Sequence, residues 1–86
     1  MPIPREQIEV DTLSILKRVS GRPIEPTLQN EVVADLGFDS VAVLELVNEL
    51  EEHFNITVPL NNLAQIKTVA QMVDHISTIC ARRVEV

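Results

Sequence analysis

The sequence predicts an all-α protein: a small bundle of three main helices and one short helix, with a long loop between the first two helices. Three segments carry apolar residues at the three- and four-residue spacing of an amphipathic helix, and residues that begin or end helices flank them. No segment shows the alternating apolar pattern of a strand. The 86 residues contain no repeat and no internal linker, so we expect residues 1–86 to form a single domain.

The first helix is predicted between Pro4 and Ser20. Proline suits an early helical position, because its missing N–H would have no partner there in any case. Gly21 is expected to end the helix in the left-handed conformation, and Pro23 prevents continuation. The buried stripe of this helix is predicted to consist of Ile8, Thr12, Ile15, Leu16 and Val19.

Residues 22–39 are predicted to form the long loop. Prolines and a glycine interrupt this segment, and no helical periodicity continues through it. A loop of this length is unusual in so small a domain, which itself points to function. The residues expected to hold the loop against the core are Ile24, Leu28, Val32, Val33 and Leu36.

The second helix is predicted from Ser40 to about Asn55. Two apolar residues, Val41 and Leu44, fall outside its buried stripe and lie on its polar side. We therefore expect exposed apolar surface within an acidic face at the Ser40 end. The buried stripe consists of Val43, Leu46, Val47, Leu50 and Phe54, and the polar side carries Glu45, Asn48 and Glu52.

Two further helices complete the bundle. One weak turn of helix is expected from Leu60 to Gln65, with Leu63 pointing inward. Thr68 is a favoured helix cap and is predicted to begin the last helix. The buried stripe of the last helix is predicted to consist of Val69, Met72, Val73, Ile76 and Ile79.

Acidic residues dominate the middle of the chain. The formal net charge is −6, which argues against nucleic-acid binding, since that needs a basic surface. No Lys or Arg occurs between Arg22 and Lys67. Such a charge favours basic protein partners, although ordinary solubility is the alternative. The eight acidic residues of this stretch are Glu25, Glu31, Asp35, Asp39, Glu45, Glu49, Glu51 and Glu52.

Composition also limits the setting. Cys80 is the only cysteine, so no intramolecular disulfide is possible. We see neither a signal peptide nor an apolar run of membrane-spanning length. We expect a cytoplasmic, monomeric protein without membrane insertion and without a metal site.

Ser40 lies between a glycine-containing turn and the second helix, and three roles are open to it. It could cap the helix, as could Asp39. Nucleophilic catalysis is disfavoured, because neither His53 nor His75 is placed to activate the hydroxyl and the G-x-S-x-G turn is absent. It could also carry a phosphodiester, which the free N–H groups and positive dipole of a helix N-terminus favour.

The segment Asp35-Leu36-Gly37-Phe38-Asp39-Ser40-Val41 resembles the phosphopantetheine attachment motif of acyl carrier proteins, commonly DLGxDSL. The resemblance covers nearly the whole chain, and the order of helices and loop agrees. It continues through Glu45-Leu46-Val47, Leu50-Glu51-Glu52, Phe54, Val58-Pro59 and Thr68-Val69.

The resemblance implies that a phosphopantetheinyl transferase attaches the 4′-phosphopantetheine of coenzyme A to Ser40. Asp39 would assist this modification, and the terminal thiol of the arm would hold an acyl group as a thioester. The chain itself would catalyse nothing. The residues expected to dock acyl-loading and processing enzymes through their basic patches are Val41, Leu44, Glu45, Asn48, Glu51 and Glu52. The residues expected to line an acyl-chain pocket are Val43, Leu46, Leu50, Val58, Ile66 and Met72, with plain core packing as the alternative.

Several positions differ from the family pattern. Val41 replaces a leucine, Ala42 stands where an acid is common, and Asn48 takes an often apolar position. Residues 60–62 replace the acidic run that opens the short helix in fatty-acid carriers. These differences make a dedicated carrier, for a polyketide, a modified lipid or an aminoacyl unit, a contender beside the housekeeping fatty acid carrier, and the sequence does not decide between the two. An aminoacyl or peptidyl carrier is an alternative, although Asp39 favours an acyl carrier because peptidyl carriers more often have Gly-Gly-His-Ser there. An unmodified helical interaction module is the alternative of another class. The cargo and the pathway cannot be read from the sequence.

Overall fold

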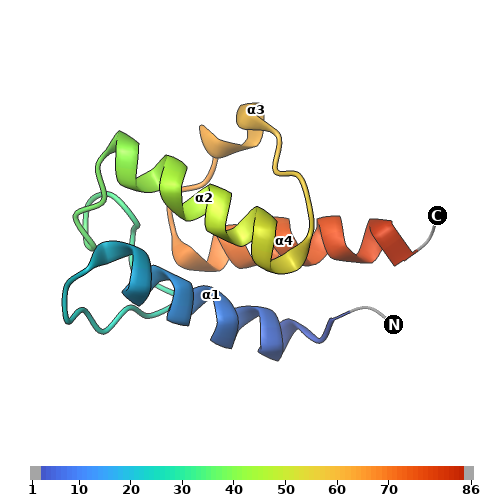
Figure 1. The fold of residues 1–86 in the computed structure, drawn as a ribbon, viewed down its shortest axis with the longest axis horizontal. Coiled ribbons are helices and arrows are strands. Elements are labelled where there is room, and N and C mark those ends of the chain that lie inside the picture. The colour runs from blue at the N-terminus through green and yellow to red at the C-terminus, as the bar shows by residue number, and fades with distance from the viewer. Residues whose placement is uncertain (1–2, 85–86) are drawn as a thin grey trace.

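A computed structural model describes residues 3–84, with side chains other than those of residues 60, 62, 83 and 84. It contains four helices: α1 (Arg5–Ser20), α2 (Ser40–Phe54), α3 (Leu60–Leu63) and α4 (Val69–Val84). The described residues form no strand, only an isolated bridge between Glu31 and Thr68. The predicted all-α fold, with three main helices and one short one, is therefore confirmed (Figure 1). Helix α3 is shorter than expected, and α2 ends one residue early.

Helix α1 packs against both α2 and α4 and runs antiparallel to them, while α3 lies across the far side of α2 (Figure 1). The long loop between α1 and α2 closes one end of the bundle. The core is largely aliphatic, because Phe38 and Phe54 are the only aromatic residues apart from the histidines. Burial of these side chains is the main stabilising contribution to the fold. The buried apolar residues include Ile8, Ile15, Leu16, Leu46, Leu50, Val69, Val73 and Ile76.

Among the described residues, Thr12 is the one polar residue in this core. Its side chain is fully buried, and its hydroxyl has no hydrogen-bond partner among the described residues. The sequence placed Thr12 on the buried stripe correctly. Its unpaired hydroxyl, however, makes the residue a local destabilising element.

The helix ends follow the expected local rules. Gly21 ends α1 with a φ of 65°, in the left-handed region. Asn55 does the same for α2 with a φ of 54°. At the start of α4 the Thr68 hydroxyl accepts a hydrogen bond from the Gln71 N–H, and the Gln71 side chain accepts one from the Thr68 N–H. This reciprocal pair is a capping box, so the predicted cap at Thr68 is confirmed.

The long loop is fixed to the start of α4 by backbone hydrogen bonds. The Val32 N–H donates to the Lys67 carbonyl, and the Val69 N–H donates to the Asn30 carbonyl. Val33 is one of the five residues expected to hold the loop against the core. This expectation is wrong for Val33, because its side chain is 63% exposed. Residues after Glu31 wind into a turn, which sends the side chain next to buried Val32 out to solvent.

Candidate functional site

Asp39, and not Ser40, caps helix α2. The Asp39 side chain accepts a hydrogen bond of 2.8 Å from the Ala42 N–H. Ser40 is then the first helical residue, is exposed, and makes no side-chain hydrogen bond with the described residues. The capping role that the sequence left open for Ser40 is therefore filled by its neighbour, and the serine hydroxyl is free to react.

The turn before the serine is held from the far end of α1. Gly37 has a φ of 72°, a conformation that favours glycine. A side chain there would also come within 3.3 Å of the Arg22 guanidinium, which covers this residue. The same guanidinium donates a hydrogen bond to the Leu36 carbonyl. The turn that delivers Ser40 is thus fixed by its own backbone and by a cation from another element.

The start of α2 has backbone N–H groups that are free to bind an anion. Of the first N–H groups of the helix, that of Ala42 bonds to the Asp39 side chain and that of Val43 to the Asp39 carbonyl. Those of Ser40 and Val41 have no partner among the described residues. Two free N–H groups and the positive end of the helix dipole therefore lie beside the serine oxygen.

An apolar hollow of about 400 Å³ adjoins this hydroxyl. Val33 and Leu44, two of its lining residues, are more than half exposed. The complete lining is Val33, Phe38, Ser40, Val43 and Leu44. Leu44 also lines a second surface groove of about 550 Å³, formed with Val47, Asn48, Glu51, Thr57, Val58 and Pro59. Apolar surface therefore continues from the serine along the outer side of α2.

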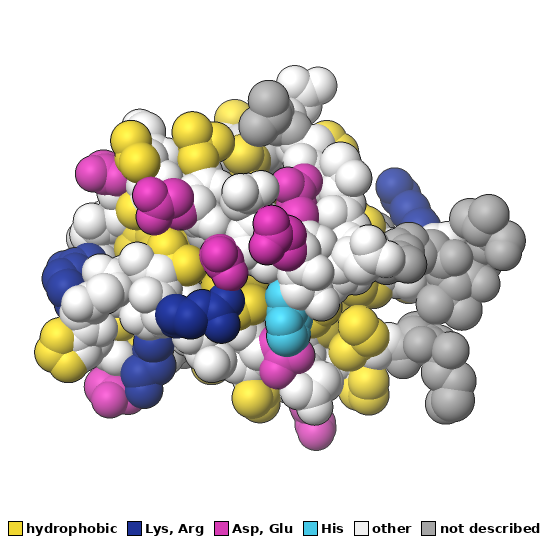
Figure 2. Space-filling model, in the orientation of Figure 1, with side chains coloured by type: hydrophobic (Ala, Val, Ile, Leu, Met, Phe, Trp, Pro, Cys, Tyr) yellow, Lys and Arg dark blue, Asp and Glu magenta, His cyan; other side chains and the backbone are white. Residues whose placement is uncertain are grey.

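Acidic side chains gather over α2 with apolar side chains beside them (Figure 2). The eight acidic residues between Arg22 and Lys67 fall into two groups in the structure. Glu31, Glu45 and Glu52 have no ion pair or side-chain hydrogen bond with the described residues. The other five accept hydrogen bonds or pair with cations within the chain: Glu25, Asp35, Asp39, Glu49 and Glu51. Of the six residues expected to dock partners, Val41, Leu44, Glu45, Asn48 and Glu52 are exposed.

Glu51 differs from that expectation. Its carboxylate is partly buried and accepts a hydrogen bond of 2.8 Å from the Val58 N–H. It therefore fixes the segment between α2 and α3, and we assign it to the fold and not to the docking surface. Helical periodicity could not reveal this, because the partner group is a backbone N–H in a segment without regular structure.

A small apolar cavity of about 10 Å³ lies between α2, α3 and α4. Four of the six residues expected to line an acyl-chain pocket do line it: Leu50, Val58, Ile66 and Met72. Val43 instead lines the hollow beside Ser40, and Leu46 is fully buried in the core without lining this cavity. The sequence reasoning missed the other lining residues, which are Val47, Leu63, His75 and Ile76. Val47 and Ile76 could have been found, because they share helix stripes with Leu50 and Met72.

The described residues contain no cluster of three or more metal-ligating side chains. They also contain no helix long and apolar enough to cross a membrane.

Comparison with known proteins decides the family. The model of the family described as "Phosphopantetheine attachment site" matches residues 6–76. An acyl carrier protein of Exiguobacterium sibiricum is 39% identical over 75 residues, which cover 86% of this chain and 95% of that protein. The chain belongs to the acyl carrier protein family. As an acyl carrier protein it bears covalent 4′-phosphopantetheine, and proteins of this family carry intermediates and do not act as catalysts.

Other relatives agree with this assignment. The meromycolate extension acyl carrier protein of Mycobacterium tuberculosis is 30% identical over 80 residues, which cover 92% of this chain and 70% of that protein. A solved structure from the same species, itself provisionally assigned as an acyl carrier protein, superposes with a TM-score of 0.78 at 28% identity. It covers 83% of this chain and 96% of its own. The solution structure of holo acyl carrier protein from Geobacter metallireducens has a TM-score of 0.79 at 24% identity, covers 91% of each chain, and supports the fold.

Proposed function

We propose that Ser40 is the residue that carries the 4′-phosphopantetheine arm. The observation that carries this proposal is the division of roles at the start of α2: Asp39 caps the helix and leaves the Ser40 hydroxyl exposed. When bound, the arm supplies a terminal thiol that holds acyl groups as thioesters. The chain supplies the attachment point and the surfaces that present the cargo.

The surroundings of Ser40 fit the phosphodiester end of the arm. The free N–H groups of Ser40 and Val41, with the helix dipole, stabilise negative charge at this point. The hollow beside Ser40 offers apolar surface close to the attachment point. An anionic group followed by a less polar chain therefore has a matching environment here.

Asp39 is expected to assist the modification as well as to cap the helix. Only one of its carboxylate oxygens, Oδ1, is engaged by the cap. The residue is exposed, so the other oxygen is open to the transferase. Asp39→Asn keeps a capping side chain and removes the charge, so it separates the two roles.

Partner enzymes are expected to dock on the outer side of α2. Glu45 and Glu52 have no partner within the described part of the chain, and Val41 and Leu44 are 63% and 55% exposed. Two free carboxylates flanking apolar anchors fit a basic patch with an apolar centre. Asn48 lies on the same exposed side. The partners would be the transferase and cytoplasmic loading and processing enzymes, which the protein serves as a monomer.

The cargo that we propose is an acyl intermediate of fatty acid, lipid or polyketide synthesis. One relative is named for meromycolate extension, and a 5-methylorsellinic acid synthase of Aspergillus terreus contains a segment 29% identical over 77 residues. The cavity between α2, α3 and α4 has an apolar lining. Both observations support an acyl cargo over an aminoacyl one.

Intact mass tests the attachment site. The protein is incubated with coenzyme A and a phosphopantetheinyl transferase, and the wild type is expected to gain the mass of one phosphopantetheinyl group. Ser40→Ala is expected to gain none, while Ser20→Ala, at the end of another helix, is expected to be modified like the wild type. An unmodified wild type under conditions that load known carriers, or a modified Ser40→Ala, would refute the proposal.

A further inference from the structure

Two surface hollows and the internal cavity follow one another from Ser40 inward, and each shares lining residues with the next. The hollow beside Ser40 shares Leu44 with the groove along α2. That groove shares Val47 and Val58 with the internal cavity. Both valines are buried but not completely, at 7% and 8% exposure, and their side chains separate the groove from the cavity. An apolar chain attached near Ser40 thus has a path into the core.

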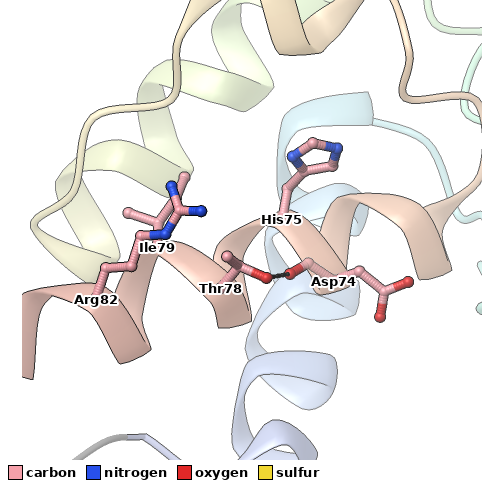
Figure 3. A pocket seen from close by; sticks show the side chains of 5 residues that line it. All are labelled: Asp74, His75, Thr78, Ile79 and Arg82. Carbon is pink, nitrogen blue, oxygen red and sulfur yellow. Dashed lines mark hydrogen bonds between the residues drawn. The ribbon is translucent and has the colours of Figure 1, made fainter.

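The far end of this series is His75. This residue lines the internal cavity and also lines a hollow of about 340 Å³ on the outer side of α4. In Figure 3, His75, Ile79 and Arg82 project from the same side of α4. The other residues of the outer hollow, Asp74 and Thr78 among them, do not line the cavity. The His75 side chain therefore separates the internal cavity from the outer hollow and its solvent.

The cavity is too small to hold an acyl chain as it stands. Its volume of about 10 Å³ is that of roughly one water molecule, so a guest must displace the lining. Close-packed side chains such as Leu50 and Ile76, at 1% exposure each, resist displacement because moving them loses contacts on all sides. The side chain that yields most easily is one that is half-buried, unbonded and backed by open space.

His75 meets these conditions. It is half-buried, and its side chain has no hydrogen bond or ion pair with the described residues. The outer hollow lies directly behind it, and its polar ring can be hydrated there. Leu63 and Ile66 are also half-buried, but neither lines the hollow behind His75 or the groove along α2.

We propose that His75 is the end wall of the acyl path and determines how long an acyl chain the protein can shelter. Chains that reach His75 push the imidazole toward the outer hollow, and longer chains remain partly in solvent. This inference rests on the proposed function, because it requires an acyl arm attached at Ser40. It adds a residue that determines specificity and assigns it to α4, away from the attachment motif.

The test uses the intact holo protein loaded with saturated acyl groups of increasing length. Thermal unfolding of each acyl form is followed by circular dichroism. Each sheltered methylene group is expected to raise the unfolding midpoint by a few degrees at most, and the increase stops when the path is full. His75→Ala is expected to move that stopping point to chains longer by roughly two to four carbons, the space that the lost ring leaves. His75→Trp is expected to move it to shorter chains.

Arg82→Gln is the matched control, because Arg82 lines the outer hollow but not the cavity. It is expected to keep the stopping point of the wild type. An unchanged stopping point in both His75 variants would overturn the inference, as would an equal shift in the control. If one His75 variant does not fold, the stopping point measured for the other variant tests the inference. Failure of the proposed function is distinguishable, since Ser40 would then take up no arm before any acyl chain is compared.

Discussion

Two adjacent acids on α2, Glu51 and Glu52, are expected to have different roles. Replacing Glu51 with alanine should destabilise the fold, whereas replacing Glu52 should leave stability nearly unchanged and weaken binding to a partner enzyme. Glu51→Ala removes the acceptor of the Val58 N–H, a bond of 2.8 Å in a partly buried setting. Val58 is only 8% exposed, so its N–H would be left poorly solvated. An unsatisfied buried donor costs about 1–3 kcal/mol of stability. We expect Glu51→Ala to lower the free energy of unfolding by about 2 kcal/mol and the melting temperature by roughly 10 °C.

Glu52→Ala is the matched control, because it removes the same formal charge from the neighbouring position. Glu52 is exposed and has no partner among the described residues. Its replacement should change stability by no more than about 0.5 kcal/mol. Any relief of repulsion within the acidic surface is similar in the two variants, so their difference isolates the hydrogen bond to Val58.

Urea denaturation followed by circular dichroism measures both variants, and Glu51→Gln, which keeps an acceptor oxygen, should fall between them. Binding to a basic partner enzyme supplies the second readout. Glu52→Ala should weaken binding at low salt, whereas folded Glu51→Ala should bind nearly as the wild type does. Equal stabilities of the two alanine variants, or a larger loss in Glu52→Ala, would refute the assignment of Glu51 to the fold.

Three further predictions concern other parts of the molecule. Thr12→Val should raise the free energy of unfolding by about 1–2 kcal/mol in urea denaturation, because it removes a buried unpaired hydroxyl; a destabilised variant would show that the hydroxyl is satisfied. Gly37→Ala should lower stability by about 1–2 kcal/mol and slow arm transfer, because φ is 72° there and the new methyl group would press on Arg22; wild-type stability and transfer rate would contradict the turn geometry. Glu45→Lys combined with Glu52→Lys should weaken binding to a basic partner at least tenfold at low salt, and unchanged affinity would mean that this face only keeps the protein soluble.

The helices could be predicted because their signals are local. The apolar stripe from Val43 to Phe54 and the left-handed Gly21 depend on neighbours within one or two turns of chain. The arrangement of the long loop could not be predicted in the same way. Val32 bonds to Lys67 across 35 positions, and this pairing turns Val33 outward although its sequence context matches that of its buried neighbour.

The site was partly readable from the sequence for the same reason. The motif around Ser40 is contiguous, so its serine, its glycine turn and its acid could all be identified. The roles of Asp39 and Glu51 depend on which backbone N–H group each carboxylate reaches, and for Glu51 that group lies seven residues away. The cavity lies where the side chains of α2, α3 and α4 do not pack completely against one another. Periodicity indicates which face of a helix is buried but not where packing leaves space, so His75 was missed.

Ser40, left free by the Asp39 cap, is expected to carry the phosphopantetheine arm. Peptide mapping of the holo protein by fragmentation mass spectrometry identifies the modified residue, with the protein produced in cells that contain a phosphopantetheinyl transferase. We predict that the added mass is found on the tryptic peptide spanning residues 19–67, because trypsin does not cleave between Arg22 and Pro23, and that fragmentation places it on Ser40. An arm on any other residue, or no modified peptide in folded protein, would contradict the assignment of the arm to Ser40.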